Sequence, residues 1–159
     1  MATIGISGHR GLPQRTAGLV DAALRAEIGS HRPERLVGVS CIADGADSLF
    51  ARAVLDHGGQ LEVIIPADEY RDALPADHHP TYDALLATAA RVHQLPFHES
   101  TSESHMAASL AMLDLVDTLI AVWDGQPARG YGGTADVVNE ARRRGIPVLI
   151  VWPDGASRD

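Results

Sequence analysis

Lysine is absent from this sequence, and all 13 of its basic residues are arginines. The absence excludes a P-loop lysine, a Schiff base with pyridoxal phosphate or another carbonyl compound, and a kinase-type catalytic lysine. Cysteine occurs once, at Cys41, which excludes an internal disulfide bond, iron–sulfur clusters and zinc sites with four thiolate ligands. Several classes of enzyme and cofactor protein are therefore ruled out before any motif is considered.

Long hydrophobic runs are missing as well. No segment approaches the roughly 18 consecutive apolar residues of a membrane-spanning helix, so no membrane association is expected. The opening segment, MATIGISGHR, lacks the charged leader of a signal peptide, and we expect a cytoplasmic protein. The formal net charge of −8, from 13 basic and 21 acidic residues, opposes binding to a nucleic-acid backbone.

The residues that are present indicate one α/β domain. A chain of 159 residues with 45% hydrophobic and 21% charged residues is typical of a single globular domain. Short apolar runs rich in branched residues alternate with helical patterns, which predicts a Rossmann-like, doubly wound and mainly parallel sheet with helices on both faces. The expected strands cover residues 3–7, 35–41, 61–65, 92–95, 118–123 and 148–152. We expect the domain to span residues 1–155, with 156–159 as a tail.

Helices are expected around residues 16–24, 49–54, 82–89 and 101–116, and from Gly133 onward. Ser100 and Glu103 have the spacing of a capping box, which predicts a helix start near Thr101. Pro66 is expected to end the third strand, and residues 67–80 are expected to form an extended loop. The helix over residues 106–116 carries enough apolar surface to serve a possible homodimer.

The strongest candidate binding motif follows the fifth strand and opens the last helix. Gly130, Gly132 and Gly133 allow the backbone to approach a ligand closely, and free N–H groups at a helix start favour an anion. The Thr134 hydroxyl is expected to donate to a phosphate, and Asp136 projects from the first helical turn. The alternative is a flexible turn in which Asp136 only complements the helix dipole. The glycine density and the position favour phosphate or ribose binding.

A second motif, Ser7-Gly8-His9-Arg10-Gly11, comes directly after the first strand. The two glycines permit a tight turn, while His9 and Arg10 offer donors to a phosphate or a carboxylate. The spacing is not that of the GxGxxG dinucleotide fingerprint. In a parallel sheet, ligands bind beyond the carboxyl ends of the strands, so this loop and the glycine-rich segment are expected at one edge.

Acidic residues follow two of the other expected strands. Asp44, Gly45 and Asp47 lie between the second strand and its helix, where one aspartate is expected to cap the helix and the other to accept hydrogen bonds from ribose. The sequence leaves open which aspartate does which. Asp124 follows the fifth strand and is either a base, a ribose acceptor or part of an ordinary Asp-Gly turn.

Other features carry weaker signals. Tyr70 and Arg71 either close over a bound base or lie on the surface. The histidines and glutamates have no recognised metal spacing, so no metal site and no cofactor is expected; they are His78, His79, His98, Glu99, Glu103 and His105. Residues 142–144, all arginine, stand in the last turn of a helix, where positive charge is favourable, and Cys41 is expected to be a packed residue and not a nucleophile.

Taken together, the segments GISGHRG, ADGADSLFA and VDTLIAVWDGQPARGYGGTADVV resemble the SLOG superfamily, which groups the Smf/DprA and LOG (lysine-decarboxylase-like) proteins. The resemblance is to small stand-alone bacterial members and covers nearly the whole chain. It implies a Rossmann-like sheet that binds a nucleotide or a nucleotide-derived ligand, such as a nucleoside monophosphate, ADP-ribose or an NAD derivative. Some members sense such ligands, and others cleave the N-glycosidic bond.

The enzymatic members have a PGGxGTxxE loop and an Arg-Lys pair on the preceding helix. Gly133-Thr134 match the loop, Asp136 stands where its first acidic residue stands, and Ala108 and Ser109 replace the Arg-Lys pair. We therefore expect a ligand-binding sensor or carrier, with phosphate on the two glycine loops and ribose on Asp44, Asp47, Asp124 or Asp136. The alternative is a nucleotide N-glycosidase that uses Asp136, and a DNA-handling protein of the DprA type is a third class. Whether the chain is an enzyme stays open.

Overall fold

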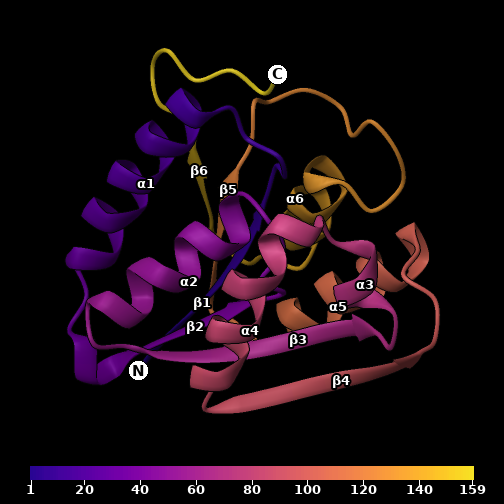
Figure 1. The fold of residues 1–159 in the computed structure, drawn as a ribbon. Helices are drawn as coiled ribbons and strands as arrows, with labels where there is room; N and C mark the ends of the chain where they lie inside the picture. Colours follow the sequence, from indigo (N-terminus) through magenta and orange to yellow (C-terminus); the bar gives the residue numbers. More distant parts are fainter.

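The computed structural model describes residues 1–159 and contains one six-stranded sheet in which all neighbouring strands are parallel (Figure 1). Along the chain the strands are β1 (Ala2–Gly8), β2 (Leu36–Ser40), β3 (Gln60–Ala67), β4 (Arg91–Phe97), β5 (Thr118–Val122) and β6 (Val148–Val151). Their order across the sheet is β4-β3-β2-β1-β5-β6. The chain thus winds outward from β1 to β4, then returns to the other side of β1, and the direction of winding switches between β1 and β5.

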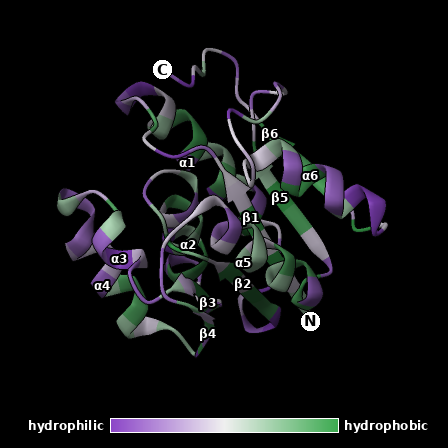
Figure 2. Cartoon of the chain, turned by 90° about the vertical axis from the view of Figure 1, so that its right-hand side faces the viewer, coloured by the Kyte–Doolittle hydropathy of each residue, from purple (hydrophilic) through white to green (hydrophobic).

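Helices cover both faces of this sheet (Figure 2). They are α1 (Gln14–Gly29), α2 (Ala46–Asp56), α3 (Tyr70–Ala73), α4 (His79–Thr88), α5 (Ser102–Leu115) and α6 (Thr134–Arg143), with single 3₁₀ turns η1 (Pro33–Arg35) and η2 (Ala76–His78). One face packs against α1, α2 and α4, and the other packs against α5 and α6. None of these helices combines the length and the apolarity that crossing a bilayer requires.

Burial explains the continuous apolar runs of the central strands. All five residues of β2 are buried, as are four of the five residues of β5. A parallel strand with helices on both faces has no solvent side, so it does not need alternating polar residues. Phe50 and Leu24 fill the α1–α2 face, and Met112 of α5 packs on the opposite face. The doubly wound α/β fold expected from the sequence is confirmed, with a sheet that is wholly and not only mainly parallel.

The segment around the third strand differs from expectation. Pro66 was expected to end the strand, but it lies inside β3, where the pairing with β4 shifts register between Ile65 and Ala67. The shift accommodates a residue that has no N–H to donate. The extended loop expected over residues 67–80 contains α3 and η2, and Tyr70 and His78 are buried there.

The start of α5 also differs in detail. Its N-cap is Thr101, whose side chain accepts from the Ser104 N–H at 3.2 Å, while the Ser104 hydroxyl accepts from the Thr101 N–H at 2.9 Å. The capping box is therefore Thr101/Ser104, and the expected pair Ser100/Glu103 is wrong. Ser100 instead bonds to the His105 ring, with 2.7 Å between Oγ and Nε2. The apolar residues of α5 pack on the sheet of the same chain, whereas Leu115 at its end is exposed.

The cap gives a stability prediction. Replacing Thr101 with alanine removes the hydroxyl that satisfies the Ser104 N–H, and we expect the free energy of unfolding to fall by about 1 kcal/mol. The matched control is Ser102→Ala, because Ser102 is exposed at the first position of the same helix and its side chain makes no hydrogen bond. Urea denaturation of the two variants measures the difference, and equal midpoints would contradict the cap assignment.

Candidate functional site

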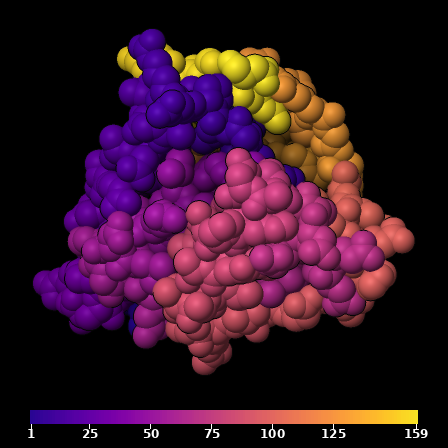
Figure 3. Space-filling view, viewed as in Figure 1, coloured from indigo at the N-terminus to yellow at the C-terminus, as the bar shows by residue number.

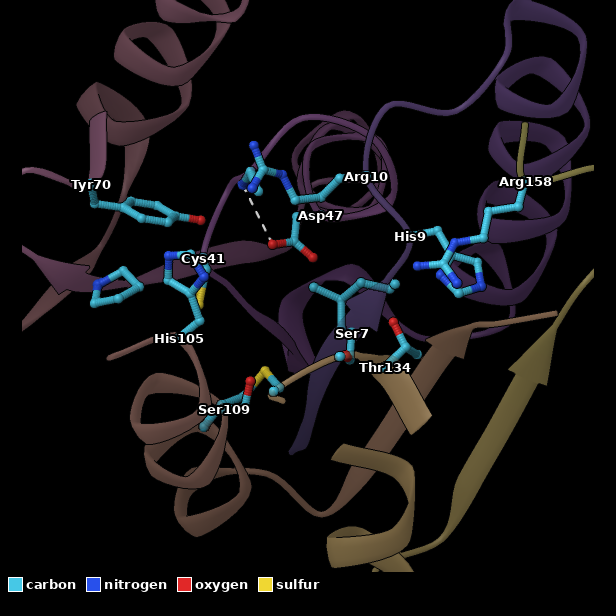
Figure 4. Close-up of a pocket in the computed structure, with 17 residues that line it drawn as sticks. Ser7, His9, Arg10, Cys41, Asp47, Tyr70, His105, Ser109, Thr134 and Arg158 are labelled. Carbon is cyan, nitrogen blue, oxygen red and sulfur yellow. Dashed lines mark hydrogen bonds between the residues drawn. The ribbon is translucent and has the colours of Figure 1, made fainter. Parts of the chain in front are cut away.

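A cavity of about 190 Å³ lies at the carboxyl end of β1, next to the switch point between β1 and β5. Ligands of open α/β sheets bind at this place. The surface is hollowed there, where the first loop, the segment before α6 and the end of the chain meet (Figure 3). Side chains from β1, the β2–α2 loop, α3, α5, α6 and residue 158 line it (Figure 4).

The first loop reaches the cavity because β1 runs directly against the start of α2. A Cβ on Gly8 would come within 2.4 Å of the Ala46 Cβ and 2.9 Å of the Val122 Cβ, so only glycine fits. The Ala46 N–H then donates to the His9 carbonyl at 3.2 Å. Beyond this contact, His9 and Arg10, which were expected to donate to a ligand, both line the cavity.

Asp44 fixes the same loop from the other side. Its carboxylate accepts from Arg10 Nε at 2.9 Å and from the Gly11 N–H at 3.0 Å. Asp44 does not line the cavity, and neither Asp44 nor Asp47 caps α2, whose N-cap is Gly45 without a side-chain hydrogen bond. The expected capping role is therefore wrong, because Asp44 is used to orient the Arg10 guanidinium.

The β2–α2 loop is strained and tightly held. Ile42 is fully buried at φ +50°, a conformation that a β-branched residue rarely adopts and that costs about 1–3 kcal/mol. The Ser40 hydroxyl accepts from the Ile42 N–H at 3.0 Å, and the buried His78 ring donates from Nε2 to the Ile42 carbonyl at 2.9 Å. The loop in this conformation places Asp47 and Cys41 on the cavity wall.

Asp47 is a partly buried carboxyl group in this wall. Burial raises its pKa to about 7, since the Ala43 N–H at 3.4 Å and the charge of Arg10 offset only part of the desolvation. Near neutral pH the group therefore exchanges between an acceptor-only carboxylate and a carboxylic acid that also donates. Burial also raises the pKa of the Cys41 thiol, which leaves it in the unreactive thiol form.

The glycine-rich segment presents unpaired donors. Gly132 adopts φ +85°, and its N–H donates to Asp136 Oδ2 at 2.9 Å. The N–H groups of Gly133, Thr134 and Ala135 have no acceptor within the chain, as expected at the start of a helix. Gly132, Gly133 and Thr134 line the cavity, whereas Asp136 does not. The carboxylate of Asp136 therefore holds the shape of the loop.

His9 is buried, at 3% exposure, and one of its ring nitrogens has no partner. The Asp124 N–H donates to Nε2 at 3.1 Å, and burial lowers the pKa of the ring, so the imidazole is neutral and carries its proton on Nδ1. Nδ1 is the buried atom that lacks a hydrogen bond. Asp124 itself bonds to the Gln126 N–H and does not line the cavity.

Eight of the twelve residues predicted to bind a ligand line the cavity. They are Ser7, Gly8, His9, Arg10, Asp47, Gly132, Gly133 and Thr134. The remaining four, Asp44, Gly45, Asp124 and Gly130, lie outside its wall.

Several residues of the cavity wall were not predicted to bind a ligand. His105, Ser109 and Met112 line the cavity from α5, and their spacing of three to four residues was the available signal for a shared helix face. Tyr70, for which the sequence left open a place over the ligand or on the surface, is 4% exposed, lines the cavity and lies edge-on to the His105 ring, with centroids 5.6 Å apart. Arg71 points elsewhere and pairs with Asp83. Arg158 joins from the expected tail, for which no sequence pattern gave a signal.

The other signals have structural explanations. No group of three or more His, Cys, Asp and Glu side chains is placed to hold a metal ion. Arg143 and Arg144 pair with Glu140 at the end of α6, and Arg144 also pairs with Asp114.

Solved structures share this arrangement of strands and helices. DNA processing protein A (DprA) from Streptococcus pneumoniae matches with a TM-score of 0.69 and 19% identity, over 98% of this chain and 52% of that chain. DprA from Helicobacter pylori matches with a TM-score of 0.69 and 16% identity, over 98% and 68%. The molybdenum cofactor binding protein of Rippkaea orientalis matches with 0.56 and 14%, over 96% and 77%. The chain has a SLOG-type Rossmann-like fold.

The chain spans about half the length of the S. pneumoniae DprA, and at these identities the likeness concerns the fold alone. No protein-family model matches the sequence, and no curated protein matches it significantly. The solved structures confirm the Rossmann-like fold that the resemblance implies.

The raised pKa of Asp47 predicts a pH-dependent stability. Because the folded-state pKa of about 7 exceeds the unfolded value, the native state binds more protons between about pH 4 and pH 7, and this contribution to stability is lost as pH rises through that window. We expect Asp47→Asn to raise the melting temperature relative to the wild type more at pH 8 than at pH 4.5. Asp72→Asn, an exposed change on α3, is the control. A difference between Asp47→Asn and the wild type that stays constant with pH would contradict the assignment.

Proposed function

We propose that this protein binds a small phosphate-bearing ligand of the nucleotide type in the β1–β5 cavity and acts as a sensor or a carrier. One observation carries the proposal. Two loops that leave the adjacent strands β1 and β5 meet in one cavity. One contains His9 and Arg10, and the other contains Gly133 and Thr134. Both loops carry hydrogen-bond donors that have no acceptor in the chain. An acceptor-rich ligand group would satisfy these donors.

The donors favour an anion. The N–H groups of Gly133, Thr134 and Ala135 stand at the amino end of α6, where the helix dipole adds positive potential. The Arg10 guanidinium uses Nε for Asp44, and its two terminal nitrogens make no hydrogen bond within the chain. Arginine is suited to phosphate because its planar fork can donate two parallel hydrogen bonds.

The opposite side of the cavity fits an organic group. Tyr70, His105 and Met112 provide apolar and aromatic surface, while Asp47 and Ser109 provide polar atoms among them. The volume of about 190 Å³ lies below the roughly 300–1,000 Å³ of pockets for drug-sized ligands. A nucleoside monophosphate held by its phosphate and sugar, or a larger derivative that extends into solvent, matches this size.

The placement of Asp136 favours binding over glycosidic cleavage. A residue that stabilises an oxocarbenium-like centre must face the ligand. Asp136 accepts from the Gly132 N–H and lies outside the cavity wall. The solved molybdenum cofactor binding protein with this fold supports a small-molecule role. The ssDNA-binding DprA structure supports the nucleic-acid alternative, which the net charge of −8 opposes.

Binding can be measured by saturation-transfer NMR and calorimetry with AMP, ADP-ribose, NAD and adenosine. We expect the phosphorylated compounds to bind more tightly than adenosine, and Thr134→Val to weaken AMP binding by roughly fivefold, because one hydroxyl donor is lost. Thr134→Ser keeps the hydroxyl and serves as the control. Equal affinity of AMP and adenosine for the wild type would contradict the phosphate site.

The same NMR time course separates the alternatives. Release of a free base from any compound would establish N-glycosidase activity, and Asp136→Asn would then abolish the turnover if Asp136 were the catalyst. Gel-shift titration at low salt tests the third class, for which micromolar binding to single-stranded DNA would replace the small-ligand proposal. Binding without cleavage and without DNA binding is the outcome that we expect.

A further inference from the structure

Residues 152–159, which follow β6, do not lead away from the fold. They run back over the carboxyl edge of the sheet, between the first turn of α1 and the segment that precedes α6 (Figures 1 and 3). Trp152 begins this return and packs edge-on against the His9 ring, with centroids 5.5 Å apart. The end of the chain therefore passes beside the cavity.

The return is attached to α1 by a reciprocal pair of hydrogen bonds. The Thr16 hydroxyl donates to the Ser157 carbonyl at 2.8 Å and accepts from the Ser157 N–H at 2.9 Å. Thr16 is 2% exposed, and its hydroxyl has no other partner. Without Ser157, a buried hydroxyl would lose both of its hydrogen bonds, which is unfavourable.

A second attachment joins the return to the glycine-rich segment. Arg129 donates to both carboxylate oxygens of Asp159, at 2.9 and 2.7 Å. Arg129 directly precedes Gly130, so this pair links the end of the chain to the segment whose Gly132 and Gly133 line the cavity. An exposed ion pair contributes little stability by itself. Together with the hydrogen bonds between Thr16 and Ser157, however, this ion pair restrains the position of residues 157–159.

Between the two attachments, Arg158 lines the cavity. Its guanidinium lies beside the His9 ring, on the same side of the cavity as Thr134 (Figure 4). The neighbouring carboxylates are engaged elsewhere, because Asp159 pairs with Arg129 and the Asp124 carboxylate accepts from the Gln126 N–H. Arg158 itself makes no hydrogen bond or ion pair within the chain, which leaves all of its donors available.

We propose that Arg158 is a ligand-binding residue, and that residues 152–159 form a strap which holds its guanidinium against the anionic group bound by the glycine-rich segment. Two kinds of donor then meet at the cavity without acceptors in the chain: the helix-start N–H groups and the Arg158 guanidinium, which lies beside the buried His9 ring (Figure 4). This inference rests on the proposed phosphate site and adds the residue that sets its charge.

The direct test is calorimetric titration of AMP into Arg158→Gln, Arg158→Lys and the control Arg91→Gln, which removes an exposed arginine of β4 with no ion pair. We expect Arg158→Gln to weaken AMP binding roughly tenfold, Arg158→Lys to weaken it less, and Arg91→Gln to leave it unchanged. The salt dependence of binding is also expected to flatten in Arg158→Gln. Wild-type affinity and wild-type salt dependence in Arg158→Gln would overturn the inference.

A second variant tests the strap without touching the cavity. Thr16→Val conserves size but removes both hydrogen bonds to Ser157, and we expect it to weaken AMP binding roughly threefold while Arg158 is still present. Thermal melts confirm that each variant is folded under the titration conditions. Tight AMP binding that neither variant changes would overturn the strap and leave the proposed function intact. A wild-type protein that binds no phosphorylated compound would overturn both.

Discussion

The site depends on the contact between the end of β1 and the start of α2. Gly8 lies so close to Ala46 that no side chain fits, and the Ala46 N–H reaches the His9 carbonyl. This contact leaves the chain after β1 no room to continue as a strand, so it turns with His9 and Arg10 over the cavity. Asp44, from the loop before α2, then bonds to Arg10 and Gly11. One steric constraint thus fixes both the position of the first loop and the orientation of its cation.

Most of the fold could be predicted because its signal is local. Strands buried on both faces are continuous apolar runs, and the amphipathic helices between them repeat apolar residues at helical spacing. The predictions of a strand end and of a helix cap were wrong where the structure depends on a residue from another part of the chain or from the next turn. Pro66 stays in β3 because the ladder with β4 shifts register around it, and Thr101 caps α5 because Ser104 reciprocates. Neither partner can be identified from the residue alone.

Part of the cavity wall was predictable for a related reason. Loops after β1 and β5 had to meet, because the carboxyl ends of neighbouring parallel strands share an edge. The roles of the acidic residues were not predictable, since a loop carboxylate can equally bind a ligand or a backbone N–H. Asp44 and Asp136 accept hydrogen bonds from backbone N–H groups and lie outside the cavity wall, whereas Asp47 lines the cavity. Arg158 could not be found at all, because its position depends on Thr16, 142 positions earlier in the chain.

A chain of net charge −8 can still hold an anion site, because acidic and basic groups around the cavity are neutralised to different extents. Arg10 lines the cavity but forms an ion pair with Asp44. Asp47 loses much of its negative charge near neutral pH, because burial raises its pKa to about 7. The cavity therefore holds less negative charge than its residues suggest, while Arg158 keeps its full positive charge. Because screening confines such differences to about 10 Å at 0.1 M salt, the acidic surface elsewhere does not cancel them. Local pairing, and not the net charge of the chain, decides which sign of ligand this cavity accepts.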